Sequence, residues 1–298
     1  MTPSATTQDA VSVFEGQRER LTRLAYRMLG SLAEAEDAVQ DAWLRFARAD
    51  LAALRDPVAW LIRVTTRLCL DRQRAAKAQR DAYKGPWLPE PFVEEAFDDP
   101  VERAEEVSVA FLLALQRLSP LERAVFLLHD VFDQEYAEIA QTLDRSEVAC
   151  RRLAARARVH IEAARPRFSP PPEEAARLAG AFMYAAFRND VAALASLLAK
   201  DCVLISDGGG KRAAALRPLV GREDILRFLA GLVWRSAVWP PPGELRPARI
   251  NGLPGFVVTA PDGIETFAFQ AGEKGVIAAI YIVRNPDKLL ALARTRHP

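Results

Sequence analysis

Arginine side chains gather on one short segment of the chain, and their spacing suits contact with DNA. Residues 133–158 read DQEYAEIAQTLDRSEVACRRLAARAR, in which small and apolar residues recur at the spacing of two short helices joined by a sharp turn. Ile139 on the first helix and Cys150 on the second would pack together. The arginines left on the outer side are Arg151, Arg152, Arg156 and Arg158. Because guanidinium groups bind both base edges and phosphates, the segment predicts a helix-turn-helix that binds DNA.

The turn of this motif departs from the commonest pattern. Asp144 occupies the position where glycine is usual, and aspartate adopts the left-handed conformation less readily than glycine but more readily than most residues. An alternative interpretation is an ordinary helical hairpin with a solvated basic face, because short motifs also match by accident. Segments upstream favour the first interpretation.

The composition restricts the class of protein. The length of 298 residues suggests about two domains, or three if they are small. Forty basic residues against thirty-nine acidic ones give a net charge of +1, so the chain as a whole is not a polybasic nucleic-acid-binding protein. The charge is segregated instead. Residues 145–167 contain seven arginines and two glutamates, whereas residues 94–106 contain seven acids and one arginine.

The sequence also argues against a membrane segment, a disulfide and a metal site. The start MTPSATTQDA lacks the regions of a signal peptide, and the apolar stretches are shorter than the ~18 residues that a membrane span needs. Cys69, Cys150 and Cys202 are widely separated, and the sequence has no CxxC or Cys/His cluster. We therefore expect a cytoplasmic protein without disulfides, bound metal or cofactor.

Helices are expected along most of the first half of the chain. Apolar residues recur at helical spacing over residues 8–80, where Ser31 begins a capping box and Pro57 occupies the first turn of a later helix. The inward stripe of that later helix consists of Val58, Leu61, Ile62, Thr65, Leu68 and Cys69. Helices are expected to resume near Val101 and to run to about Arg165.

Two proline-rich stretches separate these helices from each other and from a tail of different character. The first surrounds Trp87 in YKGPWLPEPFVEEAFDDP, and the second is the run of prolines at residues 170–172. Residues 173–200 are expected to be helical. Strands bounded by glycine or Pro-Asp-Gly turns are expected at residues 202–206, 255–259, 266–269 and 276–283. The chain thus combines an all-helical body with an α+β tail.

Taken in order, these segments resemble an extracytoplasmic-function (ECF) sigma factor of bacterial RNA polymerase. AEAEDAVQDAWLRF is similar to the core-binding helix of sigma region 2, and DPVAWLIRVTTRLCLDRQR is similar to its promoter-reading helix. The segment that starts at LSPLERAVF and includes the helix-turn-helix resembles sigma region 4. WLPEP, DGGGK, NGLPG and NPDKL resemble signatures of the subgroup with a fused C-terminal SnoaL-like domain. The resemblance covers nearly the whole chain.

The resemblance implies a multidomain fold. Two all-α domains, which bind polymerase and DNA, are expected to precede an α+β SnoaL-like (NTF2-like) cone domain. The expected boundaries are residues 8–80 for region 2, 81–106 for an acidic linker with WLPEP, 107–166 for region 4, 167–172 for a proline-rich spacer and 173–298 for the tail.

The resemblance also assigns functions to side chains of region 2. The helix with Asp37, Gln40, Asp41 and Trp43 is expected to bind the clamp of the largest subunit of core polymerase, since acidic and aromatic side chains suit a basic, partly apolar partner. The alternative is that Trp43 belongs to the core and the acids are only solvated.

Recognition of the minus-ten element is assigned to the following helix. Arg63, Arg67 and Arg74 are expected to hold phosphates of a separated strand. Many members of the family have Arg-Asn where this chain has Thr66 and Arg67, so individual base contacts do not carry over. The alternative is that these arginines only coat the helix.

For the minus-thirty-five element, the resemblance places the second helix of the helix-turn-helix in the major groove of promoter DNA. The side chain of Ser146 can cap this helix. The residues expected to face DNA are Arg145, Ser146, Glu147, Arg151, Arg152 and Arg156. Val148, Cys150 and Leu153 are expected to pack inside the motif instead.

The tail is expected to regulate rather than to catalyse. Its strands contain no histidine, and DGGGK lacks the spacing of a Walker motif. The subgroup carries this tail in place of a separate anti-sigma factor, so none is expected, and the tail should dock on the helical body or on the linker. The residues expected in this contact are Trp87, Pro89, Asp207, Gly208, Gly209, Gly210, Lys211, Asn251, Gly252, Asn285, Pro286 and Asp287. A tail pocket that binds an unidentified small molecule is a further alternative.

Three hypotheses of function follow. The leading one is a sigma factor that binds core polymerase and promoter DNA. A stand-alone helix-turn-helix regulator is the second, and it leaves the resemblance to region 2 unexplained. The third is a SnoaL-type enzyme fused to a DNA-binding body. A pull-down with core polymerase separates the first hypothesis from the other two.

Overall fold

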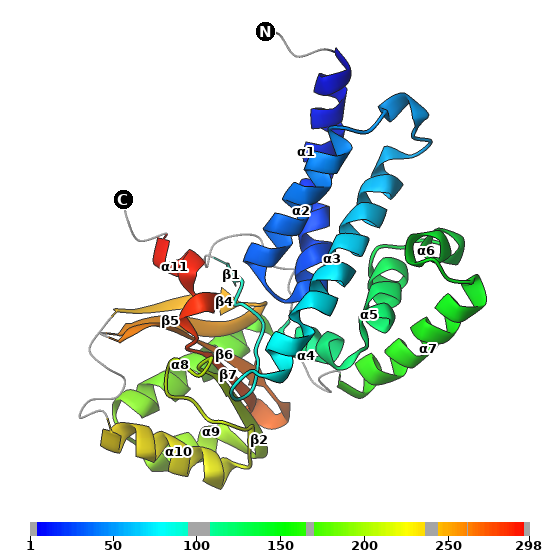
Figure 1. Cartoon of the computed structure of the whole chain (residues 1–298). Helices are drawn as coiled ribbons and strands as arrows, with labels where there is room; N and C mark the ends of the chain where they lie inside the picture. Colours follow the sequence, from blue (N-terminus) through cyan, green and yellow to red (C-terminus); the bar gives the residue numbers. More distant parts are fainter. Residues whose placement is uncertain (1–4, 95–107, 165–169, 236–243, 261, 295–298) are drawn as a thin grey trace. The chain divides into compact units, whose positions relative to one another are not determined.

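The computed structural model describes residues 5–94, 108–164, 170–235, 244–260 and 262–294. The greater part of the acidic stretch and the first half of the proline-rich spacer lie outside these residues, as does the start of the helix expected near Val101. The chain divides into two compact units. The first, here called the helical body, consists of Met1–Asp81 and Leu112–Arg165, and the second consists of Ala82–Phe111 and Pro166–Pro298. The linker, residues 82–94, therefore belongs to the same unit as the tail (Figure 1).

The first part of the helical body contains three long helices. They are α1 (Ala5–Leu29), α2 (Leu32–Phe46) and α3 (Pro57–Asp81), with a short 3-10 turn, η1 (Leu51–Ala53), before α3. The Ser31 hydroxyl accepts a hydrogen bond from the Glu34 amide at 3.3 Å, which confirms the predicted cap of α2. The predicted inward stripe of α3 is buried from Leu61 to Cys69, while Val58 is half-buried.

The second part of the helical body leads to the helix-turn-helix. Its elements are α4 (Val109–Arg117) from Leu112 onward, α5 (Pro120–Phe126), a π-helical turn η2 (Leu127–Val131), α6 (Tyr136–Leu143) and α7 (Glu147–Ala164). A complete capping box starts α5, because Ser119 and Glu122 bond to each other's backbone amides. The helix starts are therefore fixed by short polar side chains next to prolines or acids.

The tail contains a seven-stranded mixed sheet. Its strands are β1 (Val93–Glu94), β2 (Leu198–Asp207), β3 (Leu219–Val220), β4 (Glu244–Ile250), β5 (Leu253–Ala260), β6 (Gly263–Ala271) and β7 (Ile277–Val283). Their order is β1-β4-β5-β6-β7-β2-β3, and β2 with β7 is the parallel pair among the described strands. The edge strand β1 comes from the linker, where Val93 pairs with Ile250.

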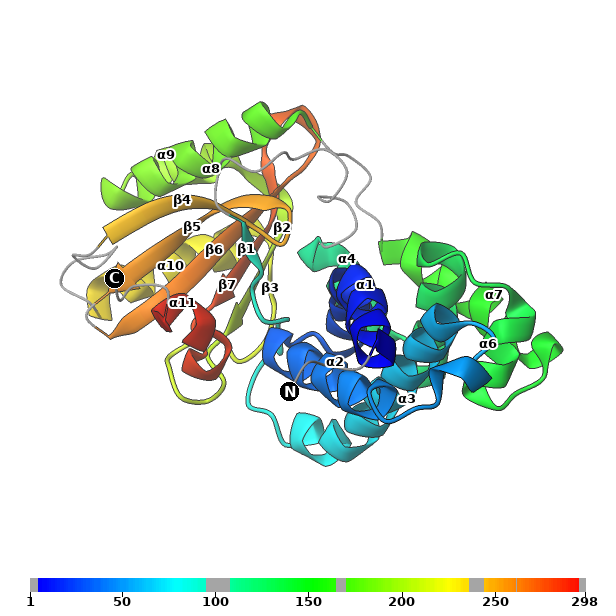
Figure 2. The ribbon, with the colours of Figure 1, turned by 90° about the horizontal axis from the view of Figure 1, so that it is seen from above.

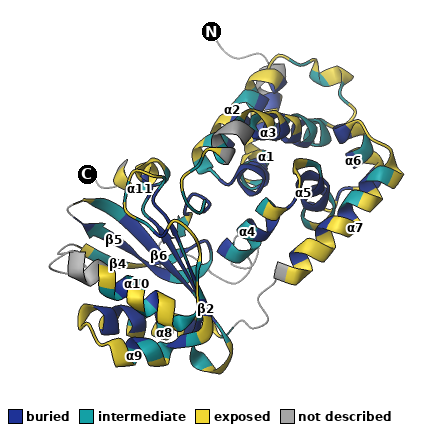
Figure 3. Cartoon of the chain, turned by 60° about the horizontal axis from the view of Figure 1, so that its bottom comes forward, coloured by how far each residue is buried: buried dark blue, intermediate teal, exposed yellow. Residues whose placement is uncertain are grey.

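Helices cover one face of this sheet (Figure 2). They are α8 (Pro172–Phe187), α9 (Val191–Leu197) and α10 (Arg222–Arg235), and the short elements η3 (Glu273–Gly275), η4 (Pro286–Lys288) and α11 (Leu290–Arg294) complete the tail. Phe182 on α8 packs against Phe269 on β6, and Ile225 on α10 is fully buried in the same core. Figure 3 shows how continuous the burial is along the central strands.

The four predicted strands are confirmed. Strands β2, β5 and β6 extend further than predicted, whereas β7 begins one residue later than predicted. Strand β4 and helix α10 were not predicted. The sequence of β4 is ELRPARI, where charged residues and Pro247 obscure the alternation of a strand. Its pairing with β5 supplies the stability that the local sequence does not indicate.

Candidate nucleic-acid interface and linker site

Helices α6 and α7 form the expected helix-turn-helix. Ile139 and Cys150 are fully buried. Asp144 ends α6 in the left-handed conformation, with φ 54° and ψ 57°, which its short polar side chain tolerates. The Ser146 hydroxyl accepts a hydrogen bond from the Ala149 amide at 3.2 Å and so satisfies an amide at the start of α7.

Most arginines on the outer side of α7 already have partners within the protein. Arg151 donates to Glu147 at 3.1 Å, and its guanidinium lies 4.5 Å from the centre of the Tyr136 ring. Arg156 Nε donates to Glu122 Oε1 at 2.8 Å. These contacts orient the guanidinium groups on an exposed helix face without burying them, since the side chains of both arginines are about 60% exposed.

The carboxylate of Glu122 connects the start of α5 to α7. Its Oε2 accepts bonds from the Ser119 amide at 3.0 Å and from the Ser119 hydroxyl at 2.8 Å. Burial raises the pKa of Glu122, but the bonds from Ser119 and Arg156 outweigh burial and lower the pKa below its usual value. The carboxylate therefore stays ionised and holds the two helices together.

One residue of α7 contradicts its predicted position. Val148 was expected to pack inside the motif, but its side chain is 59% exposed. Cys150 is two positions further along the chain, and two steps of about 100° each place Val148 on the opposite side of the helix. The burial of Cys150 is confirmed, while Leu153 is half-buried and Arg152 is exposed.

Of the three arginines expected near the minus-ten element, Arg67 contacts the helix-turn-helix. Its Nε donates to the Thr142 carbonyl at 2.9 Å and its Nη2 to the Gln141 carbonyl at 3.1 Å. These carbonyls end α6, where no further helical amides are available and a cation is favoured. Arg63 is half-buried and Arg74 is exposed. The structure thus does not bring these arginines to one common acceptor.

Two other arginines of the helical body also donate to backbone carbonyls and connect the first three helices with the later ones. Arg123 is 4% exposed and donates to the carbonyls of Met28 and Leu115. Arg20 donates to the Phe132 carbonyl at 3.1 Å and lies over the ring of the same residue. Burial lowers the pKa of Arg123. The first three helices and the later helices are thus connected repeatedly by the same kind of contact, a hydrogen bond from an arginine to a backbone carbonyl near the end of a helix.

The polar residues expected to bind core polymerase lie on one face of α2. Asp37 and Gln40 are exposed, and Asp41 pairs with Arg72 at 2.6 Å. Leu44 is 45% exposed and follows Asp37, Gln40 and Asp41 at the spacing of one helix face. Leu44 was not predicted as part of this surface, although the same spacing in the sequence could have indicated it.

Trp43 is partly in the core and partly at the surface. Its side chain is half-buried, and its ring centroid lies 4.9 Å from that of Phe14 on α1. One ring face is used for packing, and the remaining exposed part is available to a partner.

The tail and the linker meet at a buried carboxylate. Asp207 at the end of β2 is 0% exposed. It accepts hydrogen bonds from the Tyr83 hydroxyl at 2.5 Å, the Leu88 amide at 2.8 Å and the Gly209 amide at 3.0 Å. It also forms an ion pair with Lys288 at 2.7 Å. Two of these four partners belong to the linker, so Asp207 fixes the linker on the tail.

Lys288 completes this cluster, which we call the linker site. Its ammonium group donates to the Leu88 carbonyl at 2.5 Å, besides the bond to Asp207. It lies 3.7 Å from the centre of the Trp87 ring and 5.0 Å from that of Tyr83. The side chain of Lys288 is 11% exposed. The two aromatic rings attract its ammonium group, and this cation–π attraction is stronger because little water surrounds the charge.

Asn285 connects the DGGGK loop to the linker. Its side-chain amide donates to the Tyr83 hydroxyl at 2.8 Å, and its backbone amide donates to the Asp207 carbonyl. Gly209 has a positive φ of 62°, and a Cβ there would lie 2.4 Å from the Asn285 side chain. Burial and the hydrogen bond to Asp207 raise the pKa of Tyr83. The tyrosine therefore remains a proton donor at neutral pH.

Asn251 holds the other end of the linker. Its Oδ1 accepts a bond from the Phe92 amide at 3.2 Å, and its own amide donates to the Phe92 carbonyl at 2.8 Å. The residue is 2% exposed and has a positive φ of 49°. Gly252 follows it in the same tight turn, and β1 then pairs with β4.

The predicted tail and linker residues separate into two groups. Asp207, Asn285, Asn251, Trp87 and the glycine at 209 lie in or directly beside the contacts described above. Pro89 and Gly208 are also buried. The predicted residues with a more peripheral place are Gly210, Lys211, Gly252, Pro286 and Asp287. Of these, Lys211 and Asp287 form an ion pair in which both side chains are more than half exposed.

Tyr83 and Lys288 were not predicted as site residues. Lys288 lies within the NPDKL motif, and Tyr83 lies four residues before the WLPEP motif. The two motifs are about 200 residues apart in the sequence. A cation–π contact between the lysine of one and the aromatic residues near the other can be predicted only when the fold is known to bring them together.

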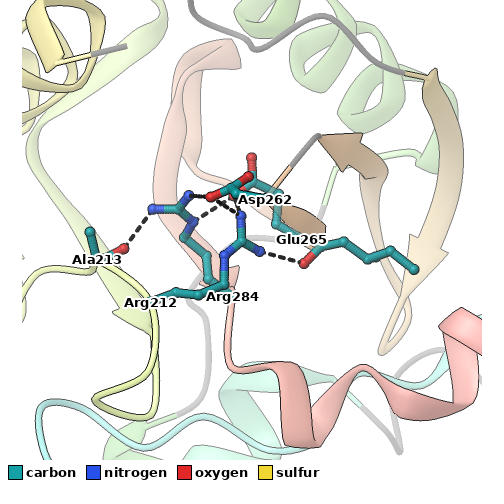
Figure 4. Close-up of polar contacts among 6 residues, drawn as sticks. Arg212, Ala213, Asp262, Glu265 and Arg284 are labelled. Atoms are coloured by element: carbon teal, nitrogen blue, oxygen red, sulfur yellow. Dashed lines mark hydrogen bonds and ion pairs between the residues drawn. The ribbon is translucent and has the colours of Figure 1, made fainter.

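A second ionic cluster holds the tail together behind the DGGGK loop (Figure 4). Arg212 and Arg284 both bind Asp262, at 2.6 and 3.2 Å. Arg284 Nε also binds Glu265, whose side chain is 3% exposed, at 2.6 Å. Since Arg284 directly precedes Asn285, this cluster positions the residues that contact the linker.

Within the described residues, no group of three or more His, Cys, Asp and Glu side chains could hold a metal ion. The helices described by the structure are also too short or too polar to cross a membrane.

Comparisons with known proteins give consistent matches. The family model for sigma-70 region 2 matches residues 13–79, and the model for sigma-70 region 4 matches residues 108–161. The ECF RNA polymerase sigma factor SigJ of Mycobacterium tuberculosis is 37% identical over an alignment of 293 residues that covers 93% of this chain and 92% of that relative. SigG of the same organism is 33% identical over 286 residues, covering 86% of this chain and 75% of that relative.

A solved structure extends the match to three dimensions. The crystal structure of Mycobacterium tuberculosis SigJ superimposes with a TM-score of 0.76 at 34% identity. It covers 94% of this chain and 98% of the solved one.

Proposed function

Because the chain belongs to the extracytoplasmic-function family of RNA polymerase sigma factors, we propose that separate surfaces of its helical body bind core polymerase and the two promoter elements. The chain directs RNA polymerase to promoters. Its fold is the expected one, two all-α sigma regions followed by an α+β SnoaL-like domain.

The minus-thirty-five element is read by α7. Arg145, Ser146, Glu147 and Arg152 are exposed around the start of this helix, which is the part of a recognition helix that reaches base edges. Arg151 and Arg156 are held toward solvent by Glu147 and by the α5 cap, respectively. Fixed guanidinium groups lose less side-chain entropy on binding DNA.

The minus-ten element is bound by α3 through Arg63, Arg67 and Arg74. Arg67 uses Nε and Nη2 for the carbonyls of Thr142 and Gln141, so only part of its guanidinium group is left for a phosphate. Opening of the contact between α3 and α6 would free the whole guanidinium group for single-stranded promoter DNA, and binding to core polymerase would supply the energy for this change.

Core polymerase is bound by the exposed face of α2. Asp37, Gln40, Asp41 and the exposed part of Trp43 suit a basic, partly apolar partner, and Leu44 adds an apolar contact in their midst.

The tail modulates activity by restraining the linker. The observation that supports this proposal is the buried Asp207, which accepts bonds from Tyr83 and Leu88 on the linker. The linker joins α3 to the segment that leads to the helix-turn-helix. While it is fixed on the tail, the two promoter-reading parts have less freedom to reach their separate elements, and the tethered tail competes with polymerase at high effective concentration.

In vitro transcription with core polymerase tests both proposals. We expect the full chain to start transcripts at mapped sites on genomic DNA. Lys288→Gln removes the ion pair to Asp207 and both ring contacts. The linker should then leave the tail more readily, so transcript yield should rise several-fold at equal protein concentration.

Lys211→Gln is the matched control for this variant. Lys211 lies in the neighbouring DGGGK loop, but its ion pair with Asp287 is exposed to solvent and therefore weak. It should leave the transcript yield at the wild-type level. Equal yields from the wild type and Lys288→Gln would contradict regulation through the linker, and an absence of transcripts would contradict the promoter-binding roles.

We also propose that the tail has no catalytic activity. The space between its sheet and helices is filled by aromatic rings, since the Phe269 centroid lies 5.1 Å from that of Phe182 and 6.4 Å from that of Phe256. A small pocket between α8, α9 and α10 is lined by apolar side chains and Asn189, none of which could act as a general acid or base. Turnover that survives removal of the helical body would instead support a SnoaL-type enzyme, and DNA binding without core polymerase would support the stand-alone regulator.

Independence from a separate anti-sigma factor stays a prediction. It follows from the linker site, because a restraint built into the chain needs no second protein. Co-purification of the full chain with a stoichiometric partner from its host would contradict it.

A further inference from the structure

Helix α7 presents an apolar side chain at a place where packing does not require one. Its buried face consists of Cys150, Ala154, Ala157 and Ile161, each at most 4% exposed. Val148 lies on the opposite face in the first turn of the helix and is 59% exposed. A β-branched residue at an exposed helical position is a weaker helix former than alanine. Neither the core nor the helix itself therefore accounts for valine at this position.

The surroundings of Val148 are the groups expected to contact DNA. Ser146 caps the helix just before it, and Arg152 follows one turn later on the same face. Glu147 and Arg151 form an ion pair along its side. Val148 is thus an apolar position surrounded by charged and hydroxyl side chains at the end of the helix that enters the major groove.

Only one group in the major groove offers a specific apolar contact. A valine side chain has no hydrogen-bond donor or acceptor, so it cannot read the polar edges of bases. The 5-methyl group of thymine is the apolar group displayed there, and aliphatic side chains pack against it.

We infer that Val148 recognises the 5-methyl group of a thymine in the minus-thirty-five element, beside the base or phosphate contacted by Arg152. The inference rests on the proposed placement of α7 in the major groove. It adds a specificity determinant to a surface that otherwise consists of polar contacts.

Replacement of thymine by uracil tests this contact, because it removes the methyl group and keeps base pairing. A promoter found by start-site mapping is rebuilt with uracil at each A·T pair of the minus-thirty-five element in turn. Transcription by the full chain with core polymerase is then measured at limiting protein concentration. One substitution should lower the wild-type yield about fourfold, the effect of ~0.8 kcal/mol for one methyl-sized group.

On the unmodified promoter, the transcript yield of Val148→Ala should be about fourfold below that of the wild type. Uracil at the sensitive position should not lower the yield of this variant any further. Val159→Ala is the matched control, since Val159 is 67% exposed on the same helix, about 16 Å further from its start. This control should respond to uracil like the wild type. Wild-type yields that no uracil changes would overturn the inference, and so would a Val148→Ala chain that keeps the full uracil effect. Absence of transcripts from the unmodified promoter would overturn the sigma assignment and this contact with it.

Discussion

At the scale of single residues, the linker site depends on a carboxylate that has no access to water. A buried ionised group is tolerated when each of its lone pairs has a donor and an opposite charge lies nearby. Asp207 meets both conditions, with three hydrogen-bond donors and the ammonium group of Lys288. The cost of removing any one partner is therefore much larger than for a surface pair.

We expect Asp207→Asn to lower the free energy of unfolding of the unit that contains the linker and the tail by ~3 kcal/mol. The amide keeps the shape of the side chain but removes the opposite charge from the buried ammonium group of Lys288. Chemical denaturation of the full chain measures the loss. Asp287→Asn is the control, because Asp287 is 60% exposed in its pair with Lys211 and should cost less than ~1 kcal/mol. Equal losses for the two variants would show that the site is not desolvated.

The residue-scale predictions from sequence differ in outcome for a physical reason. The left-handed Asp144 and the cap by Ser31 depend on local backbone chemistry, which a few neighbouring residues determine. The exposure of Val148 depends on which side of α7 faces the core, and an apolar residue type alone indicates the wrong side. The contact of Lys288 with Trp87 joins positions two hundred residues apart, which no local pattern indicates.

At the scale of secondary-structure elements, α5 and α7 depend on the same capping box. Glu122 binds the start of its own helix and Arg156 of the recognition helix. The position of the recognition helix therefore depends on the cap of another helix, and loss of that cap should affect both.

Ser119→Ala should lower the free energy of unfolding of the helical body by ~1 kcal/mol at neutral pH, the usual effect of losing a helix cap. The pKa of Glu122 is lowered in the folded state, so its contribution is present above its unfolded value near 4.5 and is lost as the pH falls through the folded value. Ser119→Ala removes part of that shift. The loss of unfolding free energy caused by Ser119→Ala should consequently become smaller below pH 4.5, as measured by denaturation at a series of pH values. Ser196→Ala, which removes an exposed hydroxyl bonded within its own region, should show neither effect.

The elements could be predicted where periodicity and caps agree. Helices α2 and α3 and the strands β5, β6 and β7 have such patterns. Strands β1 and β4 do not, because β1 has two residues and β4 contains a proline. Strand β1 forms through pairing of Val93 with Ile250, a contact distant in sequence, and β4 is stabilised by pairing with β5 along its whole length.

At the scale of the whole molecule, the two units are interleaved along the chain. The helical body takes its residues from both sides of the linker, while the linker itself belongs with the tail. Each unit has a core of its own, with Leu115 and Ile139 buried in one and Phe182 and Phe269 in the other.

We expect the full chain to unfold in two cooperative steps on heating or in urea, because separate cores unfold independently unless a large interface couples them. Lys288→Gln should shift the step of the tail and leave the other unchanged. Calorimetry resolves the two steps, and a displacement of both steps by this variant would contradict their independence.

Strand β1 has a practical consequence for anyone who shortens this protein. Cutting the chain before α8 takes away β4, the only neighbour that β1 has in the described sheet, together with the lysine that covers two aromatic rings. The shortened protein would expose an unpaired strand edge and the side chains of Tyr83 and Trp87. Both features promote aggregation. Its behaviour would then report self-association as much as the absence of a domain, so single substitutions are the cleaner tool.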